Sequence, residues 1–163
     1  MKIAAAPLGP FETNAYLVVA ENGKDCCVVD APKDAGPLLL AEIKKQGLNL
    51  THLLITHGHW DHMCDGRYFA DAGAKVIAHK DDQQLIENIE AYRNRYQSMI
   101  PSLSDDDFRS VNKPCIKTPH CGVPEAEFCK PGAPAKAGHL KAIRAVRHGM
   151  ALGKVPLGWV SLS

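Results

Sequence analysis

The chain has 163 residues, enough for one compact domain or slightly more than one, and enough to bury a hydrophobic core. Hydrophobic residues at 45% and charged residues at 23% lie near globular averages, which excludes disordered, collagen-like and disulfide-scaffold chains. The 19 basic and 18 acidic side chains leave a net charge of +1, so no overall field attracts nucleic acid or an anionic membrane.

Targeting signals and cysteine usage point to one compartment. No segment approaches the roughly 20 apolar residues that span a bilayer, and the apolar stretch at the start is too short for a secretory signal. The cysteines form no Cys-x-x-Cys pair and are too sparse for a disulfide scaffold. We therefore expect a cytoplasmic protein with reduced thiols and no membrane contact. The cysteines are Cys26, Cys27, Cys64, Cys115, Cys121 and Cys129.

The chain begins with strand signals. Two β-rich runs, 15–19 and 26–30, flank Asn22 and Gly23, which both tolerate the positive φ of a tight turn. This pattern predicts an antiparallel hairpin. Residues 37–47 then predict a helix, because good helix formers follow a proline suited to the first turn and precede a glycine suited to the end.

Strand and helix signals then alternate. The apolar run 48–56 predicts a buried strand, residues 66–73 a short helix ended by a glycine, and residues 74–78 another buried strand. Residues 81–99 carry apolar side chains at helical spacing and predict one amphipathic helix. A proline and an acidic cluster interrupt the pattern in residues 100–107, where we expect a solvent-facing loop rather than a capped turn or a cation site.

The character of the chain changes near residue 112. Residues 1–112 have 11 basic and 16 acidic side chains, whereas residues 113–163 have 8 and 2, with six of the eleven prolines. We therefore expect an N-terminal half and a separate, basic, Pro/Gly-rich tail, mostly loop apart from a short helix or strand at 140–147. Nucleic-acid binding by this tail is disfavoured, since Phe128 and Trp159 are its only large aromatic residues.

The most informative segment follows the strand predicted at 48–56. It contains His57, His59, Asp61 and His62 within six residues. Imidazole suits Zn²⁺ and Fe²⁺, and a carboxylate adds charge neutralisation, so the spacing predicts a metal-binding loop. In extended backbone the first two histidines lie on one side and can bind one ion, whereas Asp61 and His62 come where the chain can turn toward a second ion. Gly58 would permit the bend and leave room for the metal.

The alternative without a functional site is a histidine-rich loop with solvent-exposed rings and no metal. The remaining histidines are weaker candidates for ligands. His52 and His79 flank strands and are expected to be surface or hydrogen-bonding residues. His120, His139 and His148 lie in the tail and stay open as weak candidates.

The metal loop resembles the His-x-His-x-Asp-His signature of the metallo-β-lactamase superfamily. Segment 54–62 carries this resemblance most specifically, and segments 13–18 and 28–32 look like the first hairpin strand and the acid-ended strand of glyoxalase II-like hydrolases. The resemblance covers roughly residues 1–100. It implies an α+β fold, a four-layer αββα sandwich with the metals at one edge between the sheets.

The resemblance also implies a ligand set. His57 and His59 would ligate the first metal, and Asp61 and His62 the second, with zinc expected and iron or manganese as alternatives. Asp61 would also be the catalytic residue that orients the attacking water. Asp30 is similar to the family's strand-end acid near the site, although a turn-forming aspartate before a proline is an equal alternative.

The function implied is metal-dependent hydrolysis through a metal-bound hydroxide. The glyoxalase II-like resemblance implies a thioester such as an acyl-glutathione as substrate, and it leaves a homo-oligomer open. An alternative within the superfamily is a mononuclear iron enzyme similar to sulfur dioxygenases.

The second half departs from the family pattern. The family carries a further histidine, a bridging aspartate and a last histidine there, and none can be placed in this sequence. Segment 118–122 has the turn's residue types in a changed order, and segment 146–149 lacks the pattern. We therefore expect an incomplete second half, truncated or replaced, for instance by a reading-frame change. The corresponding alternative function is a catalytically incompetent member with a partial metal site.

Overall fold

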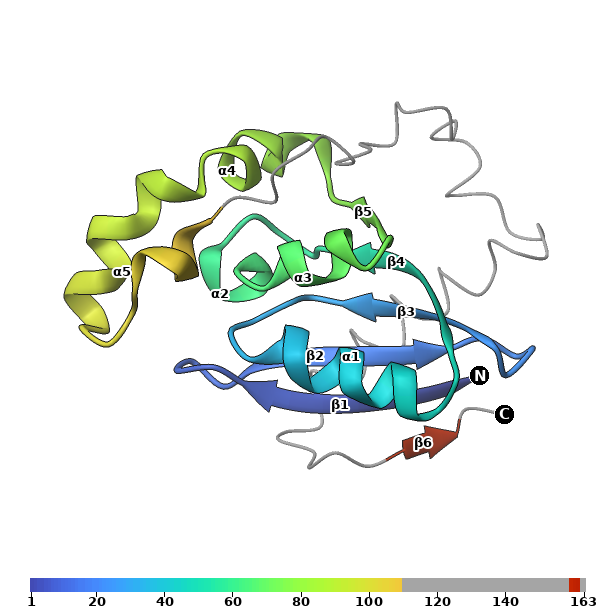
Figure 1. Ribbon diagram of the computed structural model, residues 1–163. Coiled ribbons are helices and arrows are strands. Elements are labelled where there is room, and N and C mark those ends of the chain that lie inside the picture. The colour runs from blue at the N-terminus through green and yellow to red at the C-terminus, as the bar shows by residue number, and fades with distance from the viewer. Residues whose placement is uncertain (110–158, 162–163) are drawn as a thin grey trace.

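The computed structural model describes residues 1–109 and 159–161, which form one mixed sheet in the order β5-β4-β3-β2-β1-β6 (Figure 1). The strands are β1 (Lys2–Leu8), β2 (Thr13–Val19), β3 (Asp25–Val29), β4 (Asn49–Leu54), β5 (Lys75–Ile77) and β6 (Trp159–Ser161). The pairs β1–β2, β2–β3 and β1–β6 are antiparallel, and β3–β4 and β4–β5 are parallel. The expected α+β class is confirmed.

Helices and short 3-10 turns connect the strands. The α-helices are α1 (Ala35–Lys45), α2 (Trp60–Met63), α3 (Gly66–Asp71), α4 (Gln83–Glu87) and α5 (Arg93–Met99). The 3-10 turns are η1 (Lys80–Asp82), η2 (Ile89–Tyr92) and η3 (Asp105–Phe108). No helix among the described residues is long and apolar enough to cross a membrane.

The predicted hairpin is confirmed as β2 and β3, but its two turn residues act differently. Gly23 adopts φ 69°, where a side chain would be strained. Asn22 does not take a positive φ; its side-chain oxygen instead accepts hydrogen bonds from the backbone N–H groups of Lys24 and Asp25, both at 3.0 Å. The turn therefore needs the glycine for its backbone and the asparagine for its side chain.

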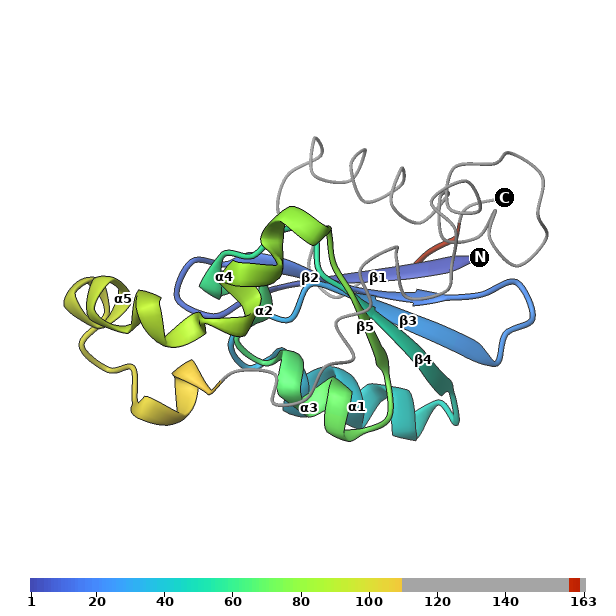
Figure 2. The same cartoon turned by 90° about the horizontal axis from the view of Figure 1, so that it is seen from above.

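Helices α1 and α3 cover one face of the sheet (Figure 2). They approach closely at Gly36, where an added Cβ would lie 2.5 Å from the Tyr68 ring. The two parallel crossovers β3-α1-β4 and β4-α3-β5 confirm the predicted helices at 37–47 and 66–73 and the strands that follow them.

Side chains alternate between the two sheet faces, as the period of a strand requires. Leu17, Val28 and Leu53 point toward the helices and are fully buried. A second buried cluster lies on the opposite face and consists of Ile3, Tyr16, Val18, Cys27, Val29 and Leu54. Each large apolar side chain so buried contributes about 1.5–3 kcal/mol.

The single amphipathic helix predicted for residues 81–99 is wrong. The segment is η1, α4, η2 and α5 in succession, and Asn88 interrupts the helical path at φ −117° and ψ 43°. Ile86, Ile89 and Tyr96, which helical spacing would place on one face, are buried in the same core across these breaks. The apolar spacing is therefore retained, and only the continuity of the helix is lost.

Two predicted loops also contain regular structure. Within 100–107, Ser104 and Asp107 cap η3 reciprocally, so the acidic cluster forms a capped turn. Residues 159–161 form β6 against β1, where a loop was expected. The rest of the tail, including the segment 140–147 and the second sheet that the resemblance implies, lies outside the described residues.

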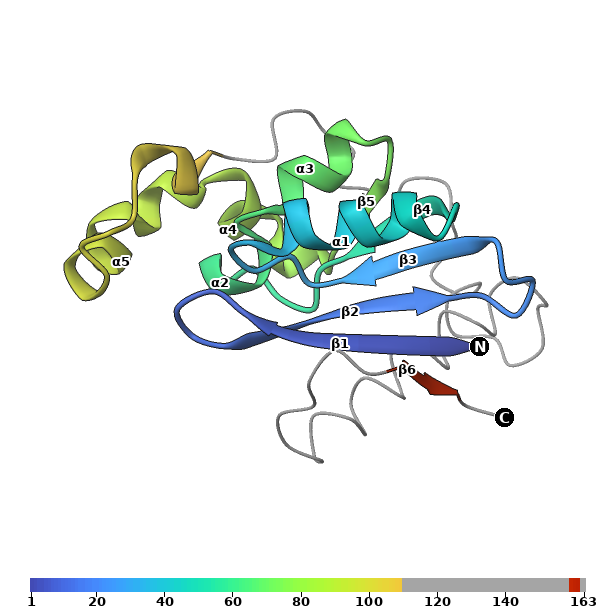
Figure 3. The same ribbon diagram turned by 60° about the horizontal axis from the view of Figure 1, so that its bottom comes forward.

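The topology gathers several chain segments at one edge of the sheet. Because β3, β4 and β5 are parallel, their carboxyl ends lie together, and the antiparallel β2 begins at that same edge (Figure 3). Thr13, Asp30, residues 56–62 and the η1 turn therefore meet there, although they come from four separate connections.

Candidate metal centre

The metal loop, residues 56–62, directly follows β4 and ends in helix α2. His59 precedes this helix in extended conformation, with φ −75° and ψ 145°. Helix α2 buries Trp60 and Met63 on one side, which turns Asp61 and His62 outward toward the sheet edge. The backbone thus passes from the extended His59 into the turn of α2 between the two pairs, as predicted, whereas Thr56 and His57 lie in a bend.

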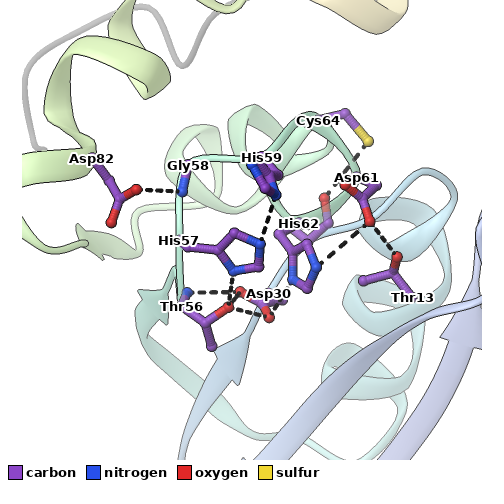
Figure 4. Close-up of polar contacts among 11 residues, drawn as sticks. Thr13, Asp30, Thr56, His57, Gly58, His59, Asp61, His62, Cys64 and Asp82 are labelled. Carbon is purple, nitrogen blue, oxygen red and sulfur yellow. Dashed lines mark hydrogen bonds and ion pairs between the residues drawn. The ribbon is translucent and has the colours of Figure 1, made fainter. Parts of the chain in front are cut away.

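The structure brings the four predicted ligands together as two pairs (Figure 4). In the first pair, Nε2 of His57 lies 3.1 Å from Nδ1 of His59. In the second pair, Oδ2 of Asp61 lies 3.5 Å from Nε2 of His62. Two donors of one tetrahedral zinc, each about 2.1 Å from the ion, are themselves about 3.4 Å apart. Each pair therefore has the separation that a shared ion requires.

The two pairs are neighbours but do not merge into a single cluster. The rings of His57 and His62, one from each pair, have centroids 4.0 Å apart. Within the part of the chain that the structure describes, no group of three or more His, Cys, Asp or Glu side chains is placed to hold one ion. Each ion would therefore take its remaining ligands from water, substrate or other residues.

Asp30 connects the sheet to both halves of the loop. This carboxylate is fully buried and has φ 58°. It accepts hydrogen bonds from the Thr56 backbone N–H at 2.8 Å and from Nδ1 of His62 at 2.8 Å. The bond leaves Nε2 of His62 free for a metal, which is the usual way a carboxylate orients a ligand histidine. The sequence left two alternatives for Asp30, a turn-forming residue and an acid near the site. The residue has a positive φ and also contacts the site through His62.

Thr56 extends this support to the first pair. Its hydroxyl donates to Asp30 at 2.8 Å and lies 3.1 Å from Nδ1 of His57. Because the hydroxyl proton is already used, His57 must donate from Nδ1, and its Nε2 keeps a lone pair. One buried carboxylate therefore determines the tautomer of a histidine in each pair.

The two halves differ in their electrostatics. The pKa of His57 is lowered by burial and by the neighbouring His62 and His59. Burial also lowers the pKa of His62, but the hydrogen bond and charge of Asp30, together with the charge of Asp61, outweigh it and raise the pKa. His57 is therefore held in the neutral form that binds metal, whereas negative charge collects around His62 and would offset a bound cation.

Gly58 has a role that the sequence did not indicate. Its backbone N–H donates to Oδ1 of Asp82 at 2.9 Å, and an added Cβ would lie 2.8 Å from Cβ of Leu85. The packing of η1 and α4 against the loop therefore requires a glycine here. That Gly58 also permits a bend and leaves room for a metal stays a prediction.

Helix α2 is also held from outside. The Trp60 indole N–H donates to the Asp107 carbonyl at 2.7 Å, and the indole packs against Tyr96 and Phe108 with centroids 5.1 and 5.6 Å away. The aromatic contacts connect α5 and η3 to the start of α2. They position the helix that carries the second pair.

The sequence missed three supporting residues, Thr13, Thr56 and Asp82. Thr56 stands next to His57, so its position could have suggested a contact, but no local spacing marks the other two. His52 and His79 are confirmed as hydrogen-bonding residues, bonded to Thr51 and to the Asp81 backbone, respectively. The tail candidates His120, His139 and His148 lie outside the described residues.

Comparisons with known proteins agree with this geometry. The family model described as "Metallo-beta-lactamase superfamily" matches residues 8–116, and the chain belongs to this superfamily. Its members generally bind zinc or iron ions.

Two curated relatives match shorter stretches. The probable metallo-hydrolase YqgX of Bacillus subtilis is 35% identical over 63 residues, which are 39% of this chain and 28% of the relative. A hydroxyacylglutathione hydrolase of Vibrio cholerae is 43% identical over 53 residues, 32% of this chain and 20% of the relative. The matched stretches thus span well under half of either relative.

Among solved structures, the BLEG-1 B3 metallo-beta-lactamase is similar with a TM-score of 0.50 and 27% identity, covering 54% of this chain and 42% of that one. The likeness is to the fold of part of each chain.

Proposed function

We propose that the chain is a metal-dependent hydrolase that cleaves a thioester of the acyl-glutathione type, with zinc bound by the two ligand pairs. The observation that carries the proposal is the arrangement of the pairs: each offers two donor atoms at the separation of a shared ion, and the hydrogen bonds of Asp30 and Thr56 leave the required nitrogens free. The similarity to a hydroxyacylglutathione hydrolase supports the substrate class.

A bound divalent metal supplies the reactive chemistry, because it lowers the pKa of water from about 16 to about 7 and polarises a carbonyl oxygen. The chain's own residues arrange this chemistry. His57 and His59 would hold one ion through Nε2 and Nδ1. His62 would hold the other through Nε2 while Asp30 keeps its ring oriented from Nδ1.

Asp61 has the catalytic role in this proposal. Its carboxylate lies beside His62 at the start of α2 and is one-fifth exposed, with 21% side-chain accessibility. In this position the Asp61 carboxylate would ligate a bound ion and would accept a hydrogen bond from the attacking water, which would orient the water toward the acyl carbon. Asp61 therefore connects metal binding with the direction of attack.

A second candidate is a chain that binds metal incompletely and does not turn over. It is favoured by the finding that no group of three or more donors converges among the described residues. Two protein donors per ion give weaker binding than the three or four typical of zinc sites.

The test is metal content per chain after purification without added metal, paired with hydrolysis of an acyl-glutathione thioester. About two zinc ions with turnover support the hydrolase, and less than one ion without turnover supports the incomplete site. A single iron with oxygen uptake would instead favour the dioxygenase-like alternative. His59→Ala serves as the control and should lower metal content well below that of the unmodified chain.

A further inference from the structure

The strand β2 reaches the metal loop through its first residue, Thr13. Strand alternation places Thr13 on the same sheet face as Ala15 and Leu17, the face that the helices cover. Its side chain is only 9% exposed, at the point where that face meets α2. A buried hydroxyl in such a position needs a hydrogen-bond partner.

That partner is the carboxylate of Asp61. The Thr13 hydroxyl donates to Oδ2 at 2.8 Å, across 48 residues of sequence (Figure 4). The direction is fixed, since a carboxylate only accepts. Oδ2 is also the oxygen that lies 3.5 Å from Nε2 of His62. The bond from Thr13 therefore falls on the donor atom of the second pair.

The bond restricts a side chain that would otherwise rotate. The terminal torsion of aspartate is broad, so either oxygen could face His62 in a free side chain. With the hydroxyl on one lone pair of Oδ2, the carboxylate plane is set by a residue of the sheet, and the other lone pair of this oxygen remains for a cation. Hydrogen bonds of this kind commonly change metal affinity about 10- to 100-fold.

We propose that Thr13 is the positioning residue for Asp61 and determines the affinity of the second ligand pair for its metal. The proposal rests on the proposed function insofar as Asp61 and His62 share an ion. It assigns Thr13 no effect on the first pair, because His57 and His59 have separate support from Thr56 and from the Asp82 contact at Gly58.

The test uses the full chain and zinc alone as the probe. Thr13→Val keeps the shape and removes the hydroxyl, and Thr13→Ser keeps the hydroxyl. Thr51→Val is a matched control, because Thr51 also donates a half-buried strand hydroxyl, to the Cys26 carbonyl at 2.9 Å, but does not contact the loop. Stepwise zinc affinities are measured by competition with a chromogenic chelator, and His62→Ala identifies the step that belongs to the second pair.

Thr13→Val is expected to weaken the second step by about 10-fold or more and to leave the first within about twofold. Thr13→Ser should restore the second step to within about threefold, and Thr51→Val should change neither. Thr13→Val should have no further effect in an Asp61→Asn background, since the partner is already altered. Thr13→Ala carries the same test if the valine variant does not fold.

Three results would overturn the proposal. Unchanged affinities in Thr13→Val would show that the bond does not reach the metal. An equal loss in both steps would show that Thr13 braces the whole loop. A wild-type chain without a second zinc would remove the site together with the proposed function. By contrast, two zinc ions without thioester turnover would contradict only the proposed activity, and a selective loss in Thr13→Val would still support the positioning role.

Discussion

The two ligand pairs lie in one seven-residue loop, yet the protein supports them in different ways. His59 of the first pair is exposed, and the pair is supported by the Thr56 hydroxyl beside His57 and by the packing of Gly58 against α4. In the second pair, Asp61 and His62 stand on a helix and are each bonded to a different strand or strand end.

The difference separates an adaptable half from a preorganised half. Backbone support leaves ring rotation of an exposed histidine free, so ordering His59 around an ion costs conformational entropy. In the second pair, Asp61 accepts a hydrogen bond from Thr13 and His62 donates one to Asp30, so these side chains are already ordered when the protein folds. Changes around the second pair should therefore alter stability and metal binding together, whereas changes in the first pair should alter mainly metal binding.

The largest effect is expected for Asp30→Ala. Because Asp30 supports both ligand pairs, this substitution should weaken both of them. The substitution leaves the Thr56 N–H and His62 Nδ1 without an acceptor and puts an alanine at φ 58°. We expect a loss of about 3–5 kcal/mol in unfolding free energy and of most bound metal. Denaturant unfolding and elemental analysis measure the two effects.

Asp30→Asn is the matched control. Asparagine tolerates positive φ and keeps an oxygen for Thr56, but its NH2 group cannot accept a hydrogen bond from His62. Asp30→Asn should therefore lose less unfolding free energy than Asp30→Ala, and the loss of metal should be confined to the second ion. Wild-type metal content in both variants would show that Asp30 has no role in the site.

Asp65, which belongs to neither ligand pair, should itself make the stability of the protein depend on pH. Its contribution has to be measured before the pH dependence of the two pairs is compared. Burial raises the pKa of Asp65 from 3.8 to about 6. The folded chain therefore binds this proton more tightly than the unfolded chain, and stability should fall by about 2–3 kcal/mol as pH rises from about 4 to above 6. Unfolding of chelator-treated protein across this range measures it.

Asp65→Asn should abolish that decline while its oxygen still accepts the Gly36 N–H, which donates to Asp65 at 2.8 Å. The variant should be more stable than the wild type above pH 6. An unchanged pH profile would assign the decline to another group.

His62→Ala and His59→Ala compare the halves directly. Loss of His62 deprives buried Asp30 of a partner and should cost about 1–3 kcal/mol in metal-free protein. Loss of the exposed His59 should stay within about 0.5 kcal/mol. Each variant should lose about one metal ion. Equal stability losses in the two metal-free variants would refute the division into adaptable and preorganised halves.

Gly58→Ala tests how the first half is held. The new Cβ would lie 2.8 Å from Leu85 Cβ and 3.2 Å from the Asp82 carbonyl, so α4 must shift, at about 1–2 kcal/mol. Leu85→Ala should relieve part of this cost, which a double-mutant cycle measures. Strict additivity of the two substitutions would show that α4 does not press on the loop.

The smallest effect is expected for Asp82→Ala, which removes the acceptor of the Gly58 N–H. We expect the unfolding free energy to fall by about 1 kcal/mol and the first zinc ion to bind a few-fold more weakly, with no change in the affinity for the second. Asp82→Asn keeps an acceptor oxygen and should resemble the wild type. If binding of the second zinc ion is weakened instead, Asp82 supports the second ligand pair and not the first.

Local chemistry made much of the fold predictable. The β2–β3 turn, the ends of α1 and α3 and the strands β4 and β5 follow from glycine, proline and apolar spacing, which act within a few residues. The continuous helix predicted at 81–99 failed because apolar spacing marks which side chains are buried, such as Ile86 and Ile89, but not where the backbone breaks, as it does at Asn88. The strand β6 could not be predicted, since its pairing with β1 joins distant segments.

The sequence by itself indicated the four proposed ligands, because His57, His59, Asp61 and His62 lie so close along the chain that a single turn brings them together. Most of their supports were decided by the tertiary structure. Thr13, Asp30 and Asp82 contact the loop across 48, 32 and 24 residues. The resemblance of its strand to that of a known family pointed to Asp30, but no local pattern marked Thr13 or Asp82. They meet because parallel strands end at the same sheet edge, so the topology of the sheet selects which side chains orient the ligands.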